Sequence, residues 1–258
     1  MEEKEKRRVQ EKHLEILAIN GGFEFTNTFF PYTSGEIGPY YVQSAVVMQN
    51  GKDYKEAVAD MRRSIELETS GGADVDVISG GETRDWIFSF PIATQMGLAP
   101  AMLYKNGKYF GPNLQNKNVV HVADLSNEGS SPRDLWVPAI RNRGGKINQI
   151  FFYVDRMEQG PIVMKELGLE SHALVPLDQN AWDYLREINA VSQTEYTNLR
   201  ERGTSREERE TWAINMLRSE VGKERLRELY NDPKQQEKAE KVILHYTNLS
   251  EELREAVN

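Results

Sequence analysis

The sequence predicts an α/β fold built around a mostly parallel sheet. Short β-branched segments alternate with segments of helical periodicity through the middle of the chain, and this alternation is typical of parallel strands joined by helices. After Asn180 the pattern becomes almost wholly helical and rich in Glu, Arg and Lys. Ligands of parallel sheets bind beyond the carboxyl ends of the strands, so we expect the functional site there.

The first 70 residues predict a helix, strands and a second helix. Residues 1–19 crowd apolar side chains on one side and end at Gly21 and Gly22, as helices commonly do. The segment FEFTNTFF alternates like a strand, and PYTSGEIGPYYVQSAVV predicts a turn followed by a strand. Between Lys52 and Glu68, apolar residues recur at the spacing of a helix: Ala57, Val58, Met61 and Ile65.

The middle of the chain predicts strands and helices in turn. The predicted strands are ADVDVISGGE, APAMLYK, NVVHVAD, INQIFFYVDR and SHALVPL. The predicted helices between them are WIFSFPIATQMGL, PRDLWVPAIRNRGG and PIVMKELGL. Beyond residue 180, SREE at Ser205–Glu208 predicts a capping box that opens a helix, and Asn231–Pro233 predicts a break.

Composition excludes several classes of site. The net charge of −8 disfavours a dedicated nucleic-acid binder. The absence of cysteine excludes disulfides, thiolate nucleophiles and zinc–sulfur sites. None of the four histidines pairs with another at ligand spacing, so we predict no metal site made by the protein alone. The charged first residues lack the apolar core of a signal peptide and no run could span a membrane, so we expect a cytoplasmic protein.

The stretch VVHVADLSNEGSSPRD, Val119–Asp134, holds the strongest functional signal. An apolar strand leads to an acid, a Gly/Ser turn and a helix start, and backbone N–H groups at a helix N-terminus bind phosphate. The alternative is an ordinary connecting loop with Ser131 as N-cap and Pro132 at the first helical position. This stretch alone does not decide between the two.

Four segments in order resemble the type I phosphoribosyltransferases and, within them, the orotate phosphoribosyltransferases. VVHVADLSNEGSS is similar to the phosphoribosyl pyrophosphate motif, and TSGEIGPYYV to the element that shelves the pyrimidine ring. YKNGKYFG resembles the stretch that contacts pyrophosphate, and VDRMEQG the strand end whose Arg binds orotate. The resemblance spans about residues 10–200. We therefore predict a type I phosphoribosyltransferase domain over residues 1–200 and a helical C-terminal extension over residues 201–258.

The resemblance implies displacement of pyrophosphate from the ribose anomeric carbon by a base nitrogen, with Mg²⁺ held mainly through the pyrophosphate. It implies Lys108 and Asp124 as the catalytic residues. It also implies a homodimer whose ligands are phosphoribosyl pyrophosphate and a base. The residues implied in substrate binding are Lys105 for pyrophosphate, Asn127, Gly129, Ser130 and Ser131 for the 5′-phosphate, Tyr40 and Tyr41 as the base shelf, and Arg156 for the base.

Each of these residues also has an ordinary structural interpretation. Tyr40 and Tyr41 fit as strand aromatics, Arg156 as a partner of Asp155 or Glu158, and the lysines as solvated loop charges. We expect Arg156 to serve the ligand, so that its loss leaves the stability of the free protein nearly unchanged.

Departures from the family pattern leave a second function open. Ala123 replaces the first acid of the motif, and Glu128 occupies a position normally held by a small residue. Tyr104 and Phe110 replace an Arg and a His, and Arg84 is predicted to supply a missing cation. A carboxylate about 4 Å from a phosphate costs on the order of 1 kcal/mol per charge in water, and we expect Glu128 to face solvent. The first alternative is a transferase acting on a pyrimidine-like base, and the second is a catalytically impaired protein that binds a nucleotide or base as sensor or scaffold. The third is a transferase with a different base or phosphorylated donor, whose pocket is built by ETRDW.

Overall fold

The computed structural model describes residues 2–257, which form two compact units. Within this part of the chain, the first unit is made of residues 2–22 and 43–181, and the second of residues 23–42 and 182–257. The division therefore falls inside the predicted domain of residues 1–200. Where the family domain itself ends stays a prediction.

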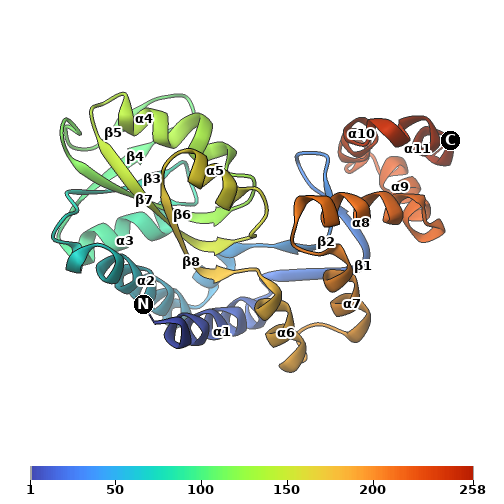
Figure 1. The fold of residues 1–258 in the computed structure, drawn as a ribbon, viewed down its shortest axis with the longest axis horizontal. Helices are drawn as coiled ribbons and strands as arrows, with labels where there is room; N and C mark the ends of the chain where they lie inside the picture. Colours follow the sequence, from blue (N-terminus) through green and yellow to red (C-terminus); the bar gives the residue numbers. More distant parts are fainter. Residues whose placement is uncertain (1, 258) are drawn as a thin grey trace. The chain divides into compact units, whose positions relative to one another are not determined.

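The first unit holds a six-stranded sheet whose strand order is β5-β4-β3-β6-β7-β8 (Figure 1). Neighbouring strands run parallel, except that β5 is antiparallel to β4. This arrangement confirms the predicted α/β fold with a mostly parallel sheet. The strands are β3 (Val77–Gly81), β4 (Ala99–Leu103), β5 (Tyr109–Phe110), β6 (Asn118–Ser126), β7 (Lys146–Asp155) and β8 (Glu170–Pro176).

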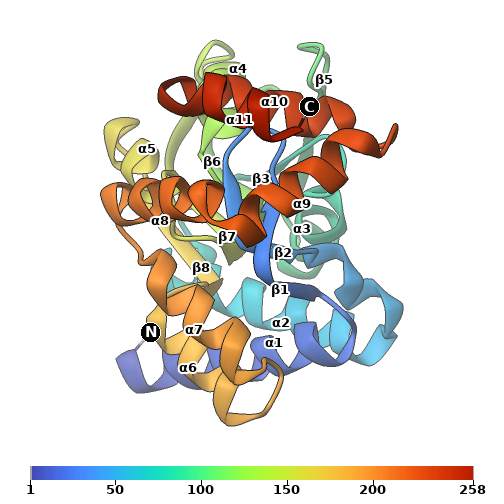
Figure 2. The same cartoon turned by 90° about the vertical axis from the view of Figure 1, so that its right-hand side faces the viewer.

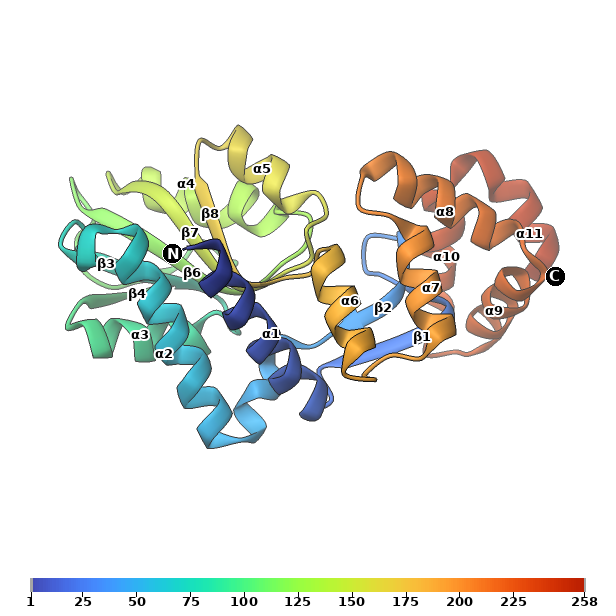
Figure 3. The same ribbon diagram turned by 60° about the horizontal axis from the view of Figure 1, so that its bottom comes forward.

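Helices cover both faces of this sheet (Figures 1 and 3). One face carries α1 (Glu3–Ile19), α2 (Gly51–Glu68) and α3 (Trp86–Met96). The other carries α4 (Val137–Arg141) and α5 (Gly160–Glu166). A π-helical turn, η3 (Pro132–Trp136), runs directly into α4, and 3-10 turns lie at η1 (Ser44–Gln49) and η2 (Ser70–Gly72).

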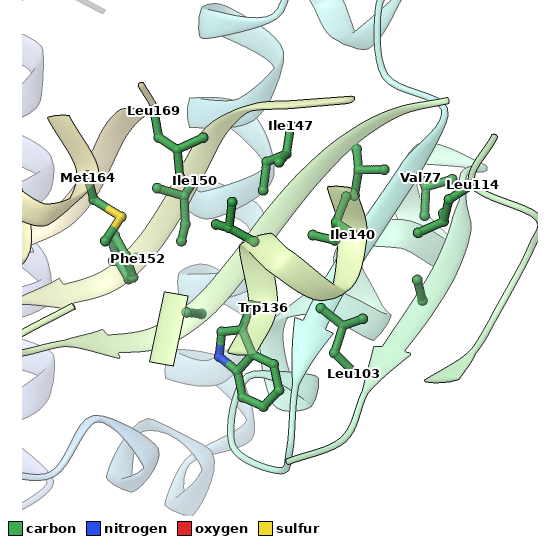
Figure 4. Close-up of a cluster of buried hydrophobic side chains, with 14 of the residues drawn as sticks. Val77, Leu103, Leu114, Trp136, Ile140, Ile147, Ile150, Phe152, Met164 and Leu169 are labelled. Carbon is green, nitrogen blue, oxygen red and sulfur yellow. The ribbon is translucent and has the colours of Figure 1, made fainter. Parts of the chain in front are cut away.

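The core under α4 and α5 fixes the position of the β6 end. Trp136 and Ile140 pack with Leu103 of β4 and with Ile150 and Phe152 of β7 (Figure 4). Nearly every residue of β6 and of the second half of β7 is buried, as expected for strands covered on both faces. The loop after β6 is therefore attached to a deeply buried part of the sheet.

The second unit combines a β-hairpin with the C-terminal helices (Figure 2). The hairpin is β1 (Phe23–Pro31) and β2 (Ile37–Val42). Ser192 and Ser205 each open a helix with a complete capping box, the second as predicted. The helices are α6 (Gln179–Glu187), in which the division falls, α7 (Gln193–Arg202), α8 (Arg206–Arg218), α9 (Glu220–Asn231), α10 (Gln236–His245) and α11 (Ser250–Val257), with a 3-10 turn η4 (Thr247–Leu249).

The hairpin and the helices share one apolar core. Phe29 and Ile37 pack with residues of the C-terminal helices, which include Trp212, Leu217, Leu226, Val242, Ile243 and Leu253. Asn198 connects the two parts: its amide donates to the carbonyls of Thr26 and Thr28, and its carbonyl accepts from the indole of Trp212 at 3.0 Å. Most apolar residues of these helices are thus covered within the unit, while Val221 and Leu244 are exposed.

No helix within residues 2–257 is both long and apolar enough to cross a membrane.

Candidate active site

Two neighbouring strands of the first unit end at one cavity of about 270 Å³. The turn after β3 and the loop after β6 form its walls, at the carboxyl edge of the sheet where the sequence predicts the site. The cavity brings together most of the predicted residues: Arg84, Lys105, Asp124, Asn127, Gly129, Ser130 and Ser131. Lys108, Tyr40, Tyr41 and Arg156 do not line it.

The loop after β6 has the backbone geometry of an anion-binding turn. Gly129 has φ +71°, and a Cβ on it would meet Val163 Cβ at 2.9 Å, so glycine is required here. Ser131 has helical dihedral angles and its side chain makes no capping hydrogen bond, unlike the N-cap of an ordinary connecting loop. No acceptor within residues 2–257 takes a hydrogen bond from the N–H groups of Gly129, Ser130 or Ser131. These donors are therefore available to a bound anion.

Asp124 lies in the cavity wall beside a second carboxyl group. Its Oδ2 accepts a hydrogen bond of 2.6 Å from Ser44 Oγ and lies 3.7 Å from Arg84 Nε. Its backbone N–H donates to Asp85 Oδ1, while Asp85 Oδ2 accepts from the N–H of Gly81. Burial and the neighbouring Asp85 raise the pKa of Asp124 to about 7, against the lowering effect of Ser44 and Arg84. Near neutral pH, Asp124 therefore exists in both protonation states.

Asp85 and Ser44 are the site residues that the sequence does not identify. Asp85 is buried, and its two oxygens hold the backbone of both the β3 turn and the β6 end. Its position directly after Arg84 in the segment ETRDW could have identified Asp85 as a site residue from the sequence. Ser44 has no such signal, because it comes from η1, 80 residues before Asp124.

Ala123 and Glu128 border the same cavity. Ala123 is buried and presents only a methyl group where the family motif has an acid. Glu128 is partly buried, and the expectation that it faces solvent stays a prediction. A phosphate in the loop would lie near this carboxylate and would be repelled by it.

Lys105 and Lys108 are separated by the structure. Lys105 lines the cavity, and its backbone N–H donates to Glu82 Oε2 at 3.0 Å. Lys108 is exposed at the end of a tight turn, where its carbonyl accepts from the N–H of Tyr104. The catalytic role predicted for Lys108 stays a prediction.

Arg156 and the two tyrosines lie in other surroundings. Arg156 is buried, and its Nη2 forms an ion pair of 2.9 Å with the buried Glu158, as one of the structural interpretations predicts. Tyr40 belongs to the second unit, is fully buried, and packs on Trp182 with ring centroids 4.9 Å apart. Tyr41 is 44% exposed. Their predicted contacts with a base stay predictions.

The cavity residues suit a magnesium ion that arrives with a pyrophosphate. Within residues 2–257 no group of three or more His, Asp or Glu could hold a metal by itself. Mg²⁺ bound to substrate phosphates needs only one or two protein carboxylates and keeps several waters. Asp124 is one of four carboxylate residues that line the cavity, with Glu82, Asp85 and Glu128, and could serve it.

Comparison with known proteins identifies sequence relatives that are named orotate phosphoribosyltransferase. The orotate phosphoribosyltransferase of Sinorhizobium medicae is 28% identical over 169 residues, which are 61% of this chain and 72% of that protein. The orotate phosphoribosyltransferase of Methanopyrus kandleri is 27% identical over 180 residues, covering 66% of this chain and 90% of that protein. No family model matches the chain.

Solved structures share the fold. The UMP synthase of Leishmania donovani superimposes with a TM-score of 0.65 at 18% identity over 74% of this chain, which spans only 41% of that longer protein. The orotate phosphoribosyltransferase of Francisella tularensis superimposes with a TM-score of 0.61 at 16% identity, covering 74% of this chain and 96% of that one. At these identities the likeness establishes the fold. Together with the sequence relatives at 27% and 28% identity, it shows that this chain has the type I phosphoribosyltransferase fold.

Proposed function

We propose that this chain binds phosphoribosyl pyrophosphate in the cavity at the ends of β3 and β6 and transfers its phosphoribosyl group to a pyrimidine-like base, such as orotate. The observation that carries the proposal is the loop at Gly129–Ser131, whose backbone donors are available beside Asp124 in one cavity. The names of the sequence relatives support orotate as the first base to test.

The transfer breaks the bond between the anomeric carbon and a pyrophosphate oxygen, which leaves with the electron pair. A base nitrogen forms the new bond and loses its proton to solvent. The N–H groups of the loop would hold the 5′-phosphate, and ionised Asp124 would accept hydrogen bonds from ribose hydroxyls. Arg84 and Lys105 border the cavity and would neutralise charge on the pyrophosphate. Magnesium bound to the donor would stabilise the charge of the leaving group.

We expect this transfer to be slow. Ala123 cannot accept a hydrogen bond from a ribose hydroxyl or a metal-bound water, so Asp124 alone must do so. Glu128 adds a negative charge next to the phosphate loop, and Asp124 is partly protonated near neutral pH. Each of these three features weakens the binding or the orientation of the donor. None of them removes the backbone N–H groups that would hold the 5′-phosphate.

The same observations favour a second candidate, a protein that binds a phosphoribosyl compound without transferring it. Arg156, the residue expected to bind the base, forms a buried ion pair with Glu158. Its guanidinium thus has a carboxylate partner before any base arrives. A sensor or scaffold would need only the phosphate loop and the ribose contact.

Calorimetry and a pyrophosphate-release assay distinguish the two candidates. With magnesium, phosphoribosyl pyrophosphate should bind weakly, and chelation of the metal should weaken binding further. Release of pyrophosphate that depends on orotate supports the transferase, whereas binding without release supports the second candidate. No binding of the donor or of orotidine monophosphate would contradict both.

A double variant tests the assignment of the loop. Ala123→Asp with Glu128→Thr restores an acid and removes the opposing charge, so donor affinity should rise by at least about fivefold. Glu187→Thr is the control variant. It removes one negative charge from an exposed residue at the end of α6, which does not line the cavity, and should leave donor affinity unchanged. If the double variant gains no affinity, the loop serves another ligand.

A homodimer also stays a proposal, drawn from the family resemblance. Light scattering at micromolar concentration should give twice the chain mass of 29.6 kDa. A particle of the monomer mass would contradict it.

A further inference from the structure

The second unit contains a cavity of its own, with a volume of about 160 Å³. The end of α7, the first two turns of α8, the end of α10 and the η4 turn enclose it, together with the residues that follow the hairpin turn. All of its lining residues belong to this one unit. The phosphoribosyl site proposed above makes no use of them.

Three guanidinium groups line this cavity, from Arg202, Arg206 and Arg209. Two carboxylates, Glu36 and Glu210, border it as well, so the wall carries a net charge of +1 with neutral histidine. His245 at the C-terminus of α10 adds a further positive charge when it is protonated. A positive cavity is notable in a chain whose net charge is −8, because its cations are not part of a general basic surface.

Arg206 occupies an unfavourable position for a cation. It is the first residue of α8, where the helix dipole favours acidic side chains over cations. Within residues 2–257 its guanidinium makes no hydrogen bond or ion pair. Arg209, one turn further, also lines the cavity and donates to the carbonyl of Thr204. The start of α8 therefore directs both its dipole and two arginines to the cavity.

A buried cation and a buried hydroxyl complete the wall. Arg202 is 6% exposed, with its guanidinium carbon 5.6 Å from the centre of the Tyr40 ring. The hydroxyl of Tyr246 accepts from the N–H of Ile37, and its own proton finds no acceptor within residues 2–257. Burial raises the pKa of Tyr246, which keeps this hydroxyl a neutral donor. Guanidinium and hydroxyl donors in a confined cavity are suited to a phosphate group.

We propose that the cavity lined by Arg202, Arg206 and Arg209 binds the phosphate group of a small phosphorylated metabolite, at a site separate from the phosphoribosyl cavity. Arg206 and Arg209 form charge-assisted hydrogen bonds with the phosphate oxygens, and Tyr246 donates one more. Ile37, Ile214 and Leu249 give the cavity an apolar wall for the body of the ligand.

Calorimetry of the full chain with inorganic phosphate at low ionic strength tests this proposal. Arg206→Gln and Arg209→Gln should each weaken one phosphate-binding component by about tenfold, the contribution of one charge-assisted hydrogen bond. Arg218→Gln is the matched control, since it removes the same charge from the exposed far end of α8 and should change affinity by less than about twofold. Acetate at equal concentration should bind much more weakly. Equal affinities in the three variants, or equal binding of acetate, would overturn the proposal.

Two further variants separate this site from the first cavity and from effects on folding. The change Ala123→Asp with Glu128→Thr alters only the first cavity, so the component that Arg206→Gln weakens should keep its wild-type affinity in that protein. If that component tightens there, as binding in the first cavity should, the phosphate was bound in the first cavity and the present proposal fails. Tyr246→Phe removes one hydroxyl and should also weaken the component, whereas unchanged affinity would exclude that hydroxyl from the site. Thermal melting of each variant verifies that the second unit is folded.

Discussion

At the scale of single residues, Asp124 shows how the structure changes the meaning of a sequence motif. The motif predicts an acid at the end of a strand, and the structure places one there. Its protonation depends on Asp85 and Ser44, which no pattern around Asp124 reveals. The sequence could therefore predict the position of this carboxyl group but not its charge.

Replacing Asp124 by asparagine should make the protein more stable at high pH. Because the pKa of Asp124 is raised from 3.8 to about 7, the folded state binds its proton more tightly, and stability is lost as pH rises through this range. Each unit of such a shift corresponds to about 1.4 kcal/mol. Asparagine stays neutral and can still accept from Ser44, so the melting temperature of Asp124→Asn relative to wild type should increase between pH 4 and 8. Asp134→Asn, at an exposed site where Arg133 lowers the pKa, should show no such gain. Parallel pH profiles for Asp124→Asn and wild type would contradict the assigned shift.

Arg156 illustrates a residue whose surroundings reverse an expectation. The sequence alone predicts that its loss leaves the free protein nearly as stable as before. The side chains of Arg156 and Glu158 are 7% and 2% exposed, so Arg156→Ala would leave a buried carboxylate without this partner. We expect a loss of about 3–5 kcal/mol in the free energy of unfolding, measured by urea denaturation. Arg133→Ala breaks the exposed pair with Asp134 and should cost less than about 1 kcal/mol. If Arg156→Ala lowers the free energy of unfolding by as little as Arg133→Ala does, Arg156 is not required for stability. Its role would then be in ligand binding alone, as the sequence predicts.

At the scale of elements, hydrophobic periodicity predicted the parallel sheet well. The five strands β3, β4, β6, β7 and β8 and the helices between them overlap the predicted segments, because strands buried on both faces have long apolar runs. The short β5 was not predicted. Its two residues lie in a segment interpreted as a loop, and their pairing depends on contact with β4. The π-helical turn η3 at the start of the predicted helix 132–145 also has no local signature.

The hairpin and its helices mark the limit of sequence reasoning at this scale. The capping box at Ser205 and the apolar residues of α8–α10 are visible in the sequence. Their partner surface is not, since Phe29 and Ile37 lie roughly 180 residues earlier in the chain. The sequence shows that a helix has an apolar face, which must be buried against another segment. Only the tertiary structure shows which segment covers it.

At the scale of the whole molecule, the chain leaves the first unit and returns to it. Residues 23–42 depart to form the hairpin of the second unit, and residues 43–181 then complete the first. The phosphoribosyl cavity is built entirely from the first unit, and the arginine-lined cavity entirely from the second. No single point in the sequence separates the two compact units, and the predicted domain boundary at residue 200 stays a prediction.

This arrangement predicts that residues 1–200 do not form a stable domain by themselves. Truncation after residue 200 would remove α8–α11 and expose Phe29 and Ile37, which are fully or almost fully buried against them. It would also remove Trp212, the partner of Asn198. We expect the shortened chain to aggregate or to bind a hydrophobic dye strongly, because a large apolar face of the hairpin becomes exposed. The matched control is truncation after residue 249, which removes only α11 and should retain a cooperative thermal transition at a lower temperature. If the chain of 200 residues instead melts cooperatively and binds no dye, the C-terminal helices are an independent extension, as the sequence predicts.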